Sequence, residues 1–415
     1  MKIRFIDYVG NPGGGIMVGT NLFLALQRLH PDVEFEFVSY GPAFMRYRRA
    51  FAEQKAQIAL RAIAPRAYWR NAASSFIARS GLDHHWQRLG SMTRWSFEAP
   101  ANAWDDCDAI ILPWAHRHVP PPDRVRVVAN MMDITCLRTA KTIREPIAQS
   151  WRENGMRNLK AWLASNHRLT AISQTTVRHI VQHTGVAPER IQAIPIVGKD
   201  INAAPPWPAE WTWGTTPFVV YPANLGPHKN HEALFKAFQL AKSDYTLVLT
   251  GSEACLWTGS ARRLMTRQQA LADYARNCGL VLGRTLISLG YIPEIRYQAL
   301  LSRAHALIMP SLMEGYGLPV DEALRAGIPV LCSDISVFRE VVKLSGGDVL
   351  WFDPKNPADI ARALLFLRNN YAEFSRRARE QVAAARRRTW RDIADVYWLL
   401  LNSALILHTK AGCIK

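Results

Sequence analysis

The sequence predicts an α/β protein built from two successive parallel sheets, each covered by helices. Short apolar runs alternate with segments of helical period along most of the chain, which is the pattern of repeated strand–helix–strand units. The alternation stops over residues 201–217, where four prolines and three tryptophans follow no period, and then starts again. The length of 415 residues also exceeds what a single hydrophobic core usually supports. These observations predict two Rossmann-like domains.

The first series of runs predicts an N-terminal domain over residues 1–200, with residues 201–217 as the linker that follows it. Its strands and helices are expected, in chain order, at Ile3–Asp7, Met17–Leu29, Val33–Ser39, Ala109–Leu112, Val125–Met131, Leu169–Ser173, Thr175–His183 and Ile191–Val197.

The second series predicts a C-terminal domain over residues 218–389. Ligands of open parallel sheets bind beyond the carboxyl ends of the strands, so we expect the site in loops there, facing a cleft between the two sheets. The chain is continuously helical after Asn356, and its apolar end, about residues 390–415, is expected to return onto the first domain. The strands and helices of this domain are expected at Phe218–Ala223, His231–Ala241, Tyr245–Gly251, Leu286–Ile292, Ala306–Ser311, Pro319–Ala326, Pro329–Ser333, Phe338–Val342 and Val349–Phe352.

Composition narrows the class of partner and the compartment. The formal charge of +17 calls for a negative partner, and nucleic acid, anionic lipid and phosphate-bearing substrates all qualify. Six cysteines lie scattered without CxxC spacing, which favours a reducing compartment and argues against a zinc site. The longest apolar stretch, Val396–Leu407, is shorter than the ~20 residues that span a bilayer. Met1–Asp7 predicts a strand instead of a signal peptide, so we expect a cytoplasmic protein.

The most informative segment is Ser311–Ala323, which follows the apolar run Ala306–Met309 and leads into a helix. Its glycines let the backbone pass close to a ligand, and Pro319 suits a first helical turn. Amides at such a helix start form an anion site. Glu314 and Glu322 are eight positions apart and could face one pocket, where carboxylates accept hydrogen bonds from vicinal sugar or ribose hydroxyls. A surface loop with a solvated glutamate is the alternative on spacing alone.

This segment resembles the signature of family 4 of the sequence-classified glycosyltransferases, which are retaining enzymes of the GT-B fold, and it meets the E-x7-E pattern in full. The resemblance implies that Glu314 lies by the donor hexose and that Glu322 holds the nucleotide ribose. The sugar and phosphate would then meet the amides of Gly315, Tyr316, Gly317 and Leu318.

A second stretch, residues 221–230, resembles the phosphate-binding loop of the same family. Lys229 fits the lysine that binds the diphosphate and neutralises leaving charge, although a lysine after a strand is more often simply solvated. Many relatives carry an arginine where this chain has Asn224, so either His228 assists, another arginine substitutes, or donor binding is weaker. Residues 288–292 resemble the strand end whose backbone pairs with the base, which adds Tyr291 and Ile292 to the expected site.

In the N-terminal domain the resemblance points to three further residues. Gly14 and Gly15 lie in a glycine cluster after the first strand, which resembles the family's donor loop, although glycine clusters most often mark turns. Asp133 occupies the place of an acceptor-positioning aspartate, while Met132 replaces the histidine that often precedes it. The similarity covers most of the chain from about Ile110 and is thin over residues 40–105.

That thin region contains a basic segment, residues 44–70. It interleaves apolar and aromatic side chains with the basic residues Arg46, Arg48, Arg49, Lys55, Arg61, Arg66 and Arg70, against Glu53 alone. Such a segment, with Phe51, Ile58, Ile63, Tyr68 and Trp69, is able to lie at an anionic membrane surface. A solvated helix face is the equally open alternative.

The resemblance implies transfer of a hexose, of mannose or glucose type, from a GDP- or UDP-sugar to a saccharide or lipid-linked acceptor in polysaccharide synthesis. It implies retention at the anomeric carbon, with no metal or other cofactor. A nucleic-acid-binding protein is a poor competitor because no DNA or RNA module is recognised. A catalytically silent partner subunit, suggested by Met132 and Asn224, stays open. An NAD-dependent enzyme is disfavoured because GxGxxG is absent after the first strand.

Overall fold

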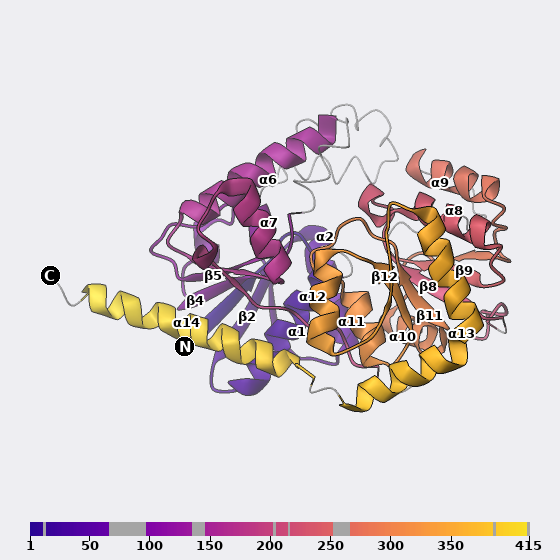
Figure 1. Ribbon diagram of the computed structural model, residues 1–415. Helices are drawn as coiled ribbons and strands as arrows, with labels where there is room; N and C mark the ends of the chain where they lie inside the picture. The colour runs from indigo at the N-terminus through magenta and orange to yellow at the C-terminus, as the bar shows by residue number, and fades with distance from the viewer. Residues whose placement is uncertain are drawn as a thin grey trace. The chain divides into compact units, whose positions relative to one another are not determined.

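The computed structural model describes residues 1–10, 14–65, 97–134, 146–201, 205–214, 216–251, 266–384 and 387–412. The chain forms two compact units: unit 1 comprises Met1–Ile196 with Arg388–Lys415, and unit 2 comprises Val197–Arg387. Each unit contains one parallel sheet with helices packed on it (Figure 1). The predicted fold class, two Rossmann-like α/β domains, is confirmed.

Unit 1 is built on a seven-stranded sheet. Its central strands are buried along their whole length because the chain covers both faces, as continuous apolar runs predict. In spatial order the strands are β3 (Ala59–Ala62), β2 (Glu34–Ser39), β1 (Lys2–Ile6), β4 (Ala109–Leu112), β5 (Val127–Met131), β6 (Arg168–Ala171) and β7 (Ile191–Ala193).

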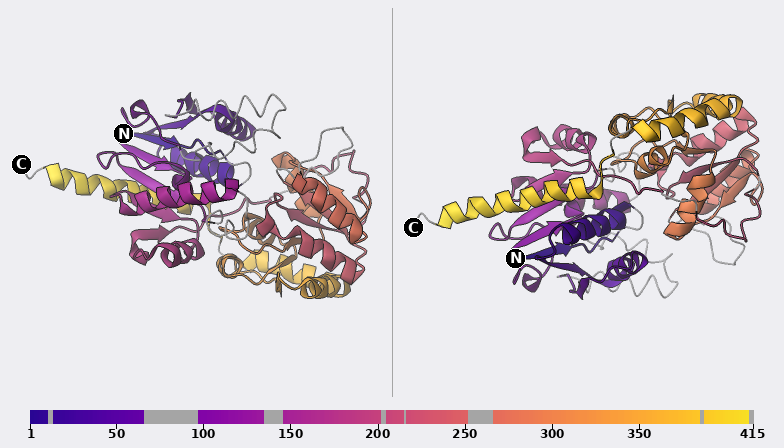
Figure 2. Two further views of the ribbon diagram at one scale, coloured as in Figure 1. Left: turned by 90° about the horizontal axis from the view of Figure 1, so that it is seen from above. Right: turned by 90° about the horizontal axis from the view of Figure 1, so that it is seen from below.

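The last helix of the chain belongs to this first unit. It is α14 (Trp390–Gly412), which packs on α1 (Gly14–Leu29), and the two run side by side in both views of Figure 2. The Trp398 ring stacks on His30 with centroids 3.5 Å apart, and the hydroxyls of Tyr397 and Thr170 lie 3.1 Å apart. The other long helices of unit 1 are α2 (Gly41–Glu53), α6 (Pro146–Ala164) and α7 (Gln174–Thr184).

Unit 2 is built on a six-stranded parallel sheet. In spatial order its strands are β10 (Leu286–Ser288), β9 (Thr246–Thr250), β8 (Phe218–Pro222), β11 (Ala306–Met309), β12 (Val330–Ser333) and β13 (Leu350–Phe352). Its helices are α8 (His231–Ala241), α9 (Thr266–Asn277), α10 (Glu294–Arg303), α11 (Leu318–Arg325), α12 (Ser336–Ser345) and α13 (Pro357–Ala384). Because β8 and β11 are neighbours, the loops that follow them share one edge of the sheet.

Three parts of the structure differ from what the apolar pattern indicates. β3 (Ala59–Ala62) was not expected, because Arg61 divides its short apolar stretch within the basic segment. α6, α9 and α10 were also missed, since their burial is one-sided or their sequences are polar. The tryptophan-rich stretch clusters with unit 2, where the Trp207 and Trp211 rings lie 5.0 Å apart and Trp213 lies 5.5 Å from Phe218.

Local sequence explains how the site helix α11 begins. Gly317, the residue before it, has a φ of 113°, a region that favours glycine. A Cβ added there would come within 2.6 Å of the Phe338 ring on α12. Pro319 follows in the first turn, where its missing N–H costs no helical hydrogen bond. The sequence therefore turns the chain sharply and starts the helix that carries Glu322.

Candidate functional site

The structure brings Lys229 and Glu314 together at the carboxyl edge of the unit 2 sheet. Lys229 ends the short turn Pro227–Lys229 after β8, and Glu314 lies in the loop after β11. Lys229 Nζ donates to Glu314 Oε1 at 2.6 Å, and the two side chains are only 14% and 12% exposed. The Tyr221 hydroxyl donates to the Lys229 carbonyl at 2.6 Å, and Leu312 N donates to the His228 carbonyl at 2.8 Å. These bonds fix one loop against the other.

The charge state of Glu314 follows from this pairing. Burial alone raises the pKa of Glu314, but the neighbouring Lys229 and His228 charges outweigh it, helped by hydrogen bonds from Lys229 and Ser311. The pKa therefore lies below its ordinary value. Glu314 is an ionised carboxylate at neutral pH, held by a lysine at the loop edge.

Asn224 shapes the loop and carries no charge. Its side-chain oxygen accepts from Gly226 N at 3.0 Å, a local bond that closes the turn after β8. A basic side chain from another element of unit 2 lies beside this loop. Arg267 of α9 reaches the Leu225 carbonyl with Nε at 3.4 Å and pairs with Glu232 at 2.8 Å.

A buried histidine lies among these basic groups. His231 begins α8 and is fully buried, and neither of its ring nitrogens has a hydrogen-bond partner among the described residues. Burial, together with the charges of Arg267, Lys229 and His228, lowers the pKa of His231 to about 3. Three basic side chains, those of Arg267, Lys229 and His228, therefore lie near the neutral imidazole of His231 in this loop.

Glu322 occupies a different environment from Glu314. It lies on α11, is 7% exposed, and accepts from the Tyr297 hydroxyl at 3.0 Å on Oε2 and from Lys199 N at 3.5 Å on Oε1. Burial, helped by the negative charge of Glu294, raises the pKa of Glu322 to about 8, although Lys199 and Tyr297 lower it. The Glu322 carboxyl group therefore holds its proton to higher pH than an ordinary glutamate does.

A buried polar network anchors the helix beneath Glu322. Asp321 is 2% exposed and accepts from Gly198 N at 2.6 Å, Arg325 Nε at 2.8 Å and Ser345 Oγ at 2.6 Å. Arg325 also reaches Asp200 at 3.2 Å. These contacts bind the start of unit 2 to α11, and with it they fix the position of Glu322.

The remaining predicted donor residues lie on the same edge of the sheet or on α11. Gly315 and Tyr316 are buried in the loop that carries Glu314. The expected row of free amides is short, since Pro319 has no N–H and both Val320 N and Asp321 N donate to the Gly317 carbonyl. Tyr291 is 53% exposed after β10, and Ile292 beside it is half-buried.

In unit 1 the predicted residues follow β1 and β5. Gly14 and Gly15 begin α1, whereas Gly13 lies outside the described residues. Asp133 is half-buried directly after β5, and Met132 is 5% exposed. The Met132 sulfur accepts from Asn130 Nδ2 at 3.2 Å, so this side chain is packed into unit 1.

A buried hydrogen bond between Asp7, just after β1, and Tyr47 was not predicted from the sequence. Asp7 is fully buried and accepts from the Tyr47 hydroxyl at 2.5 Å. Burial raises the pKa of Asp7 to about 6, although Tyr47 and the amides of Val9 and Gly10 lower it. A lone aspartate after an apolar strand gave no signal of this pairing, because its partner lies forty residues away on α2.

The basic segment folds differently from a membrane-lying helix. Tyr47 and Phe51 of α2, and Ile63 after β3, are buried in unit 1, so they are not free to enter a lipid surface. Arg46 donates to the Gly10 carbonyl at 2.9 Å. Arg48, Arg49 and Lys55 remain on the exposed face together with Met45. Arg66, Tyr68, Trp69 and Arg70 lie outside the described residues.

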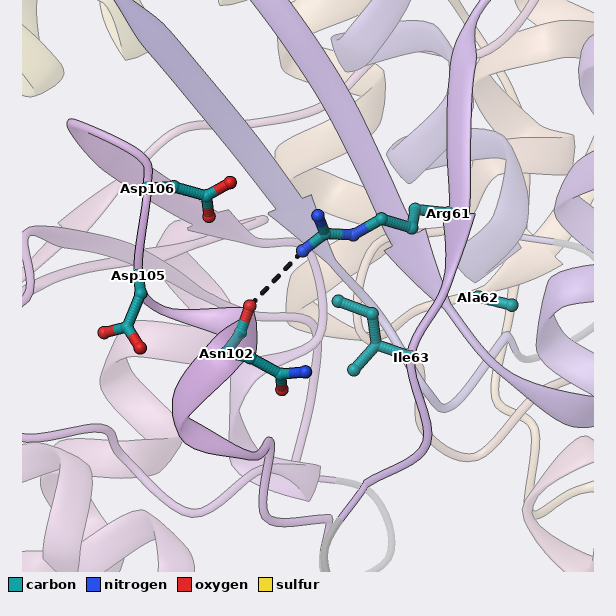
Figure 3. Close-up of a pocket in the computed structure, with 6 residues that line it drawn as sticks. All are labelled: Arg61, Ala62, Ile63, Asn102, Asp105 and Asp106. Atoms are coloured by element: carbon teal, nitrogen blue, oxygen red, sulfur yellow. Dashed lines mark hydrogen bonds between the residues drawn. The ribbon is translucent and has the colours of Figure 1, made fainter.

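One cavity in unit 1, of about 450 Å³, contains none of the predicted donor-site residues (Figure 3). Its charged lining is already engaged: Arg61 Nη2 donates to the Asn102 carbonyl at 3.3 Å, and Arg61 Nε lies 3.2 Å from Glu36. Asp106 binds the buried Arg4 guanidinium at 2.9 Å. This cavity is lined at the β3 edge by structural ion pairs, and we assign it no ligand.

The described part of the chain lacks two features. None of the groups of histidine, cysteine, aspartate and glutamate in these residues is arranged to hold a metal ion. Among the same residues, no helix combines the length and the apolar character that crossing a membrane requires.

Comparison with known proteins identifies the domain that contains this site. Residues 205–387 match the family described as "Glycosyl transferases group 1". This matched part of the chain contains Lys229, Glu314 and Glu322.

Curated relatives of the chain include bacterial O-antigen enzymes. It is 28% identical over 152 residues to "O-antigen chain mannosyltransferase B" of Escherichia coli, which is 36% of each chain. It is 32% identical over 116 residues to "O-antigen chain mannosyltransferase RfbU" of Salmonella typhimurium, covering 28% of this chain and 29% of the relative. The chain thus spans about a third or less of the length of these relatives.

Solved structures resemble the whole chain. Anabaena HepE in complex with UDP and glucose superposes with a TM-score of 0.69 at 16% identity, covering 97% of this chain and 100% of that one. WaaG, described as a glycosyltransferase involved in lipopolysaccharide biosynthesis, superposes with a TM-score of 0.59 at 14% identity, covering 97% and 99%. These similarities confirm the GT-B fold.

Proposed function

We propose that this chain is a retaining glycosyltransferase that moves a hexose from a nucleoside-diphosphate sugar to a saccharide or lipid-linked acceptor. The observation that supports the proposal most is the Lys229–Glu314 pair at the edge of a group 1 glycosyl transferase sheet, with Glu322 on the helix that follows. Cation, carboxylate and helix start are the groups that a phosphorylated sugar requires.

In this proposal the donor diphosphate replaces Glu314 as the ion-pair partner of Lys229. A phosphate is a stronger partner for the ammonium than a single carboxylate, because it offers more oxygens and more charge. His228 and Arg267 add positive charge around the same loop, so Arg267 compensates for the neutral Asn224. Glu322 accepts hydrogen bonds from the ribose hydroxyls, and Tyr291 and Ile292 lie beside the base.

The proposed reaction is a front-side displacement. The acceptor hydroxyl oxygen bonds to the anomeric carbon, the bond from that carbon to the diphosphate oxygen breaks, and the hydroxyl proton passes to the leaving diphosphate. Lys229 and the start of α11 stabilise the charge that develops on the leaving group. We propose Glu314 beside the transferred sugar and Asp133 as the group that positions the acceptor, with no metal required.

The relatives favour a place in surface-polysaccharide synthesis. Those named above are O-antigen mannosyltransferases, which makes mannose the first hexose to test, whereas HepE was solved with UDP and glucose. Incubating the protein with UDP-, GDP- and dTDP-sugars and measuring released nucleotide tests the proposal. Turnover of none of them, with a lipid-linked or saccharide acceptor present, would count against it.

A catalytically silent partner subunit is the second candidate, favoured by Met132 and Asn224. It predicts that a nucleotide sugar binds but is never turned over. Donor hydrolysis or transfer by the wild-type protein that is lost in Glu314→Ala would dismiss it. A nucleic-acid-binding role would require salt-steep affinity for oligonucleotides above that for nucleotide sugars.

We also propose cytoplasmic location and contact with an anionic membrane through the exposed face of α2. Because the aromatic residues of this segment are buried, the proposed membrane contact rests on electrostatic attraction of Arg48 and Arg49 to anionic lipid. Each arginine contributes about 1 kcal/mol of binding free energy. Co-sedimentation with phosphatidylserine-containing vesicles should fall in Arg48→Gln/Arg49→Gln. Equal sedimentation of variant and wild type would leave these arginines as a solvated helix face.

A further inference from the structure

We infer that Tyr297 and the backbone of Gly198–Lys199 are positioning groups for the nucleotide ribose, acting through Glu322. The inference rests on the proposed function, in which Glu322 meets the ribose. It adds that the carboxyl group is aimed by two elements outside its own helix: α10, and the segment through which the chain enters unit 2. None of these groups was predicted from the sequence.

The first element is α10. Tyr297 Oη donates to Glu322 Oε2 at 3.0 Å, and both side chains are largely or partly buried. A carboxyl group on a helix has several rotamers, and a hydrogen bond from a fixed neighbouring helix selects one of them. Tyr297 therefore holds Oε2 of Glu322, and the other oxygen, Oε1, lies toward residues 198–199.

The second element is the chain segment at Val197–Asp200. Lys199 N reaches the other carboxyl oxygen at 3.5 Å, and Gly198 N is held by Asp321 at 2.6 Å. A Cβ at Gly198 would lie 2.5 Å from Glu322 Cγ and 3.1 Å from Glu322 N. Only glycine leaves the space in which the Glu322 side chain lies, so residue 198 limits where this side chain goes.

The charges around Glu322 come from all three elements. α10 contributes Glu294 and Tyr297, the segment contributes Lys199 and Asp200, and α11 contributes Asp321 and Arg325. Lys199 Nζ binds Glu294 at 2.6 Å, and Arg325 binds both aspartates. Each charged group in this cluster except Glu322 thus has an ion-pair partner. Glu322 is therefore the carboxyl group that is able to lose its proton when the ribose binds.

The ribose then shares one carboxyl group with these protein donors, because its two oxygens together offer about four acceptor sites. Its vicinal hydroxyls donate hydrogen bonds, and an ionised carboxylate accepts them better than a protonated one. Binding should therefore be linked to loss of the Glu322 proton and tighten as pH rises through about 8. Tyr297 favours the ionised form, so its loss should move this midpoint to higher pH.

The experiment is calorimetric titration of the full chain with UDP and GDP, and with their 2′,3′-dideoxy counterparts, between pH 6.5 and 9.5. For Tyr297→Phe we expect about tenfold weaker binding of the ribose nucleotide, less discrimination against the dideoxy form, and a midpoint at higher pH. Gly198→Ala should weaken binding similarly. Tyr245→Phe, a buried tyrosine at the amino end of β9, is the matched control and should change neither.

Combination with Glu322→Gln separates positioning from general damage. If Tyr297 acts through Glu322, Tyr297→Phe should have little further effect in that background. An equal loss in both backgrounds, or an unchanged ratio of ribose to dideoxy affinity, would overturn the inference and leave the proposed function standing. Wild-type protein that binds neither nucleotide, nor dTDP, would overturn both.

Discussion

Glu314, in the loop after β11, and Glu322, on the helix that follows, have pKa values shifted in opposite directions. Glu314 lies 2.6 Å from a lysine and has a lowered pKa, whereas Glu322 faces a tyrosine hydroxyl and a second carboxylate and has a pKa of about 8. Both are largely buried, so burial is not what separates them. The difference comes from which charges surround each carboxyl group, and it suits one for a permanent charge and the other for exchangeable hydrogen bonds.

The largest expected effect comes from removing the charge of the first glutamate. Glu314→Gln should lower turnover by about 10²–10³-fold, the range for loss of one transition-state electrostatic contact. Nucleoside-diphosphate affinity should not fall, because the diphosphate no longer competes with a carboxylate for Lys229. Initial-rate kinetics with the donor identified in the panel measures this. Glu380→Gln, an exposed glutamate on α13, should leave turnover unaffected. A Glu314→Gln enzyme with wild-type turnover would contradict the assignment.

The second prediction concerns Lys229, the ion-pair partner of Glu314. Lys229→Gln should weaken nucleoside-diphosphate binding by about 10–100-fold, since a charge-assisted hydrogen bond contributes about 1.5–3 kcal/mol. Nucleoside binding without phosphate should be unchanged, and calorimetry with UDP and uridine, or GDP and guanosine, separates the two. Lys236→Gln on the exposed face of α8 is the control. Equal weakening of nucleoside and diphosphate would contradict a phosphate contact.

The opposite pKa shifts predict opposite effects of pH on stability. Glu322 has a raised folded pKa, so the folded state binds more protons than the unfolded state between about pH 4.5 and 8, and stability falls as pH rises through that window. Glu314 has a lowered pKa, so its contribution is present above pH 4.5 and is lost as pH falls.

Thermal unfolding of two glutamine variants therefore sharpens the comparison. Glu322→Gln should gain stability relative to wild type as pH rises from 5 to 8.5, by on the order of 1–3 kcal/mol. Glu314→Gln should be less stable than wild type throughout that range, because Lys229 is left without its buried partner. Parallel pH profiles for the two variants would show that the two environments do not differ as described.

The smallest expected effect concerns Arg267. It is 38% exposed and shared with Glu232, so Arg267→Gln should weaken diphosphate binding only about two- to fivefold, the range of a partly screened charge. The loss should shrink at high salt. Arg276→Gln on the same helix is the control, because Arg276 pairs with Asp273 on an exposed surface. A loss that is independent of salt would argue against an electrostatic role.

Much of this site is predictable from the sequence because its parts are local. Lys229, Glu314 and Glu322 each follow a strand or begin a helix at a recognisable place, and neighbouring parallel strands bring their loops together. The apolar runs that become β8 and β11 place Lys229 and Glu314 on one edge. The E-x7-E spacing then selects the two glutamates from the others in the chain.

The parts that sequence reasoning missed depend on contacts between distant residues. Tyr297 is a single aromatic residue in the largely polar helix α10, and its contact with Glu322 depends on how α10 packs beside α11. Gly198 is a single glycine with no repeat around it. The sequence left two interpretations of the basic segment open, because Phe51 suits a membrane face and a protein core equally. In the structure its ring packs 5.6 Å from that of Phe37 on β2.

The position of α14 bears on the order in which the chain folds. Unit 1 contains both Met1–Ile196 and Arg388–Lys415, so unit 2 is an insertion between the two parts of its neighbour. During synthesis from the N-terminus, unit 2 is complete before the helix that covers α1 leaves the ribosome. The face of α1 that α14 covers stays exposed until this last helix has been made, and apolar surface exposed in an incompletely folded chain promotes aggregation.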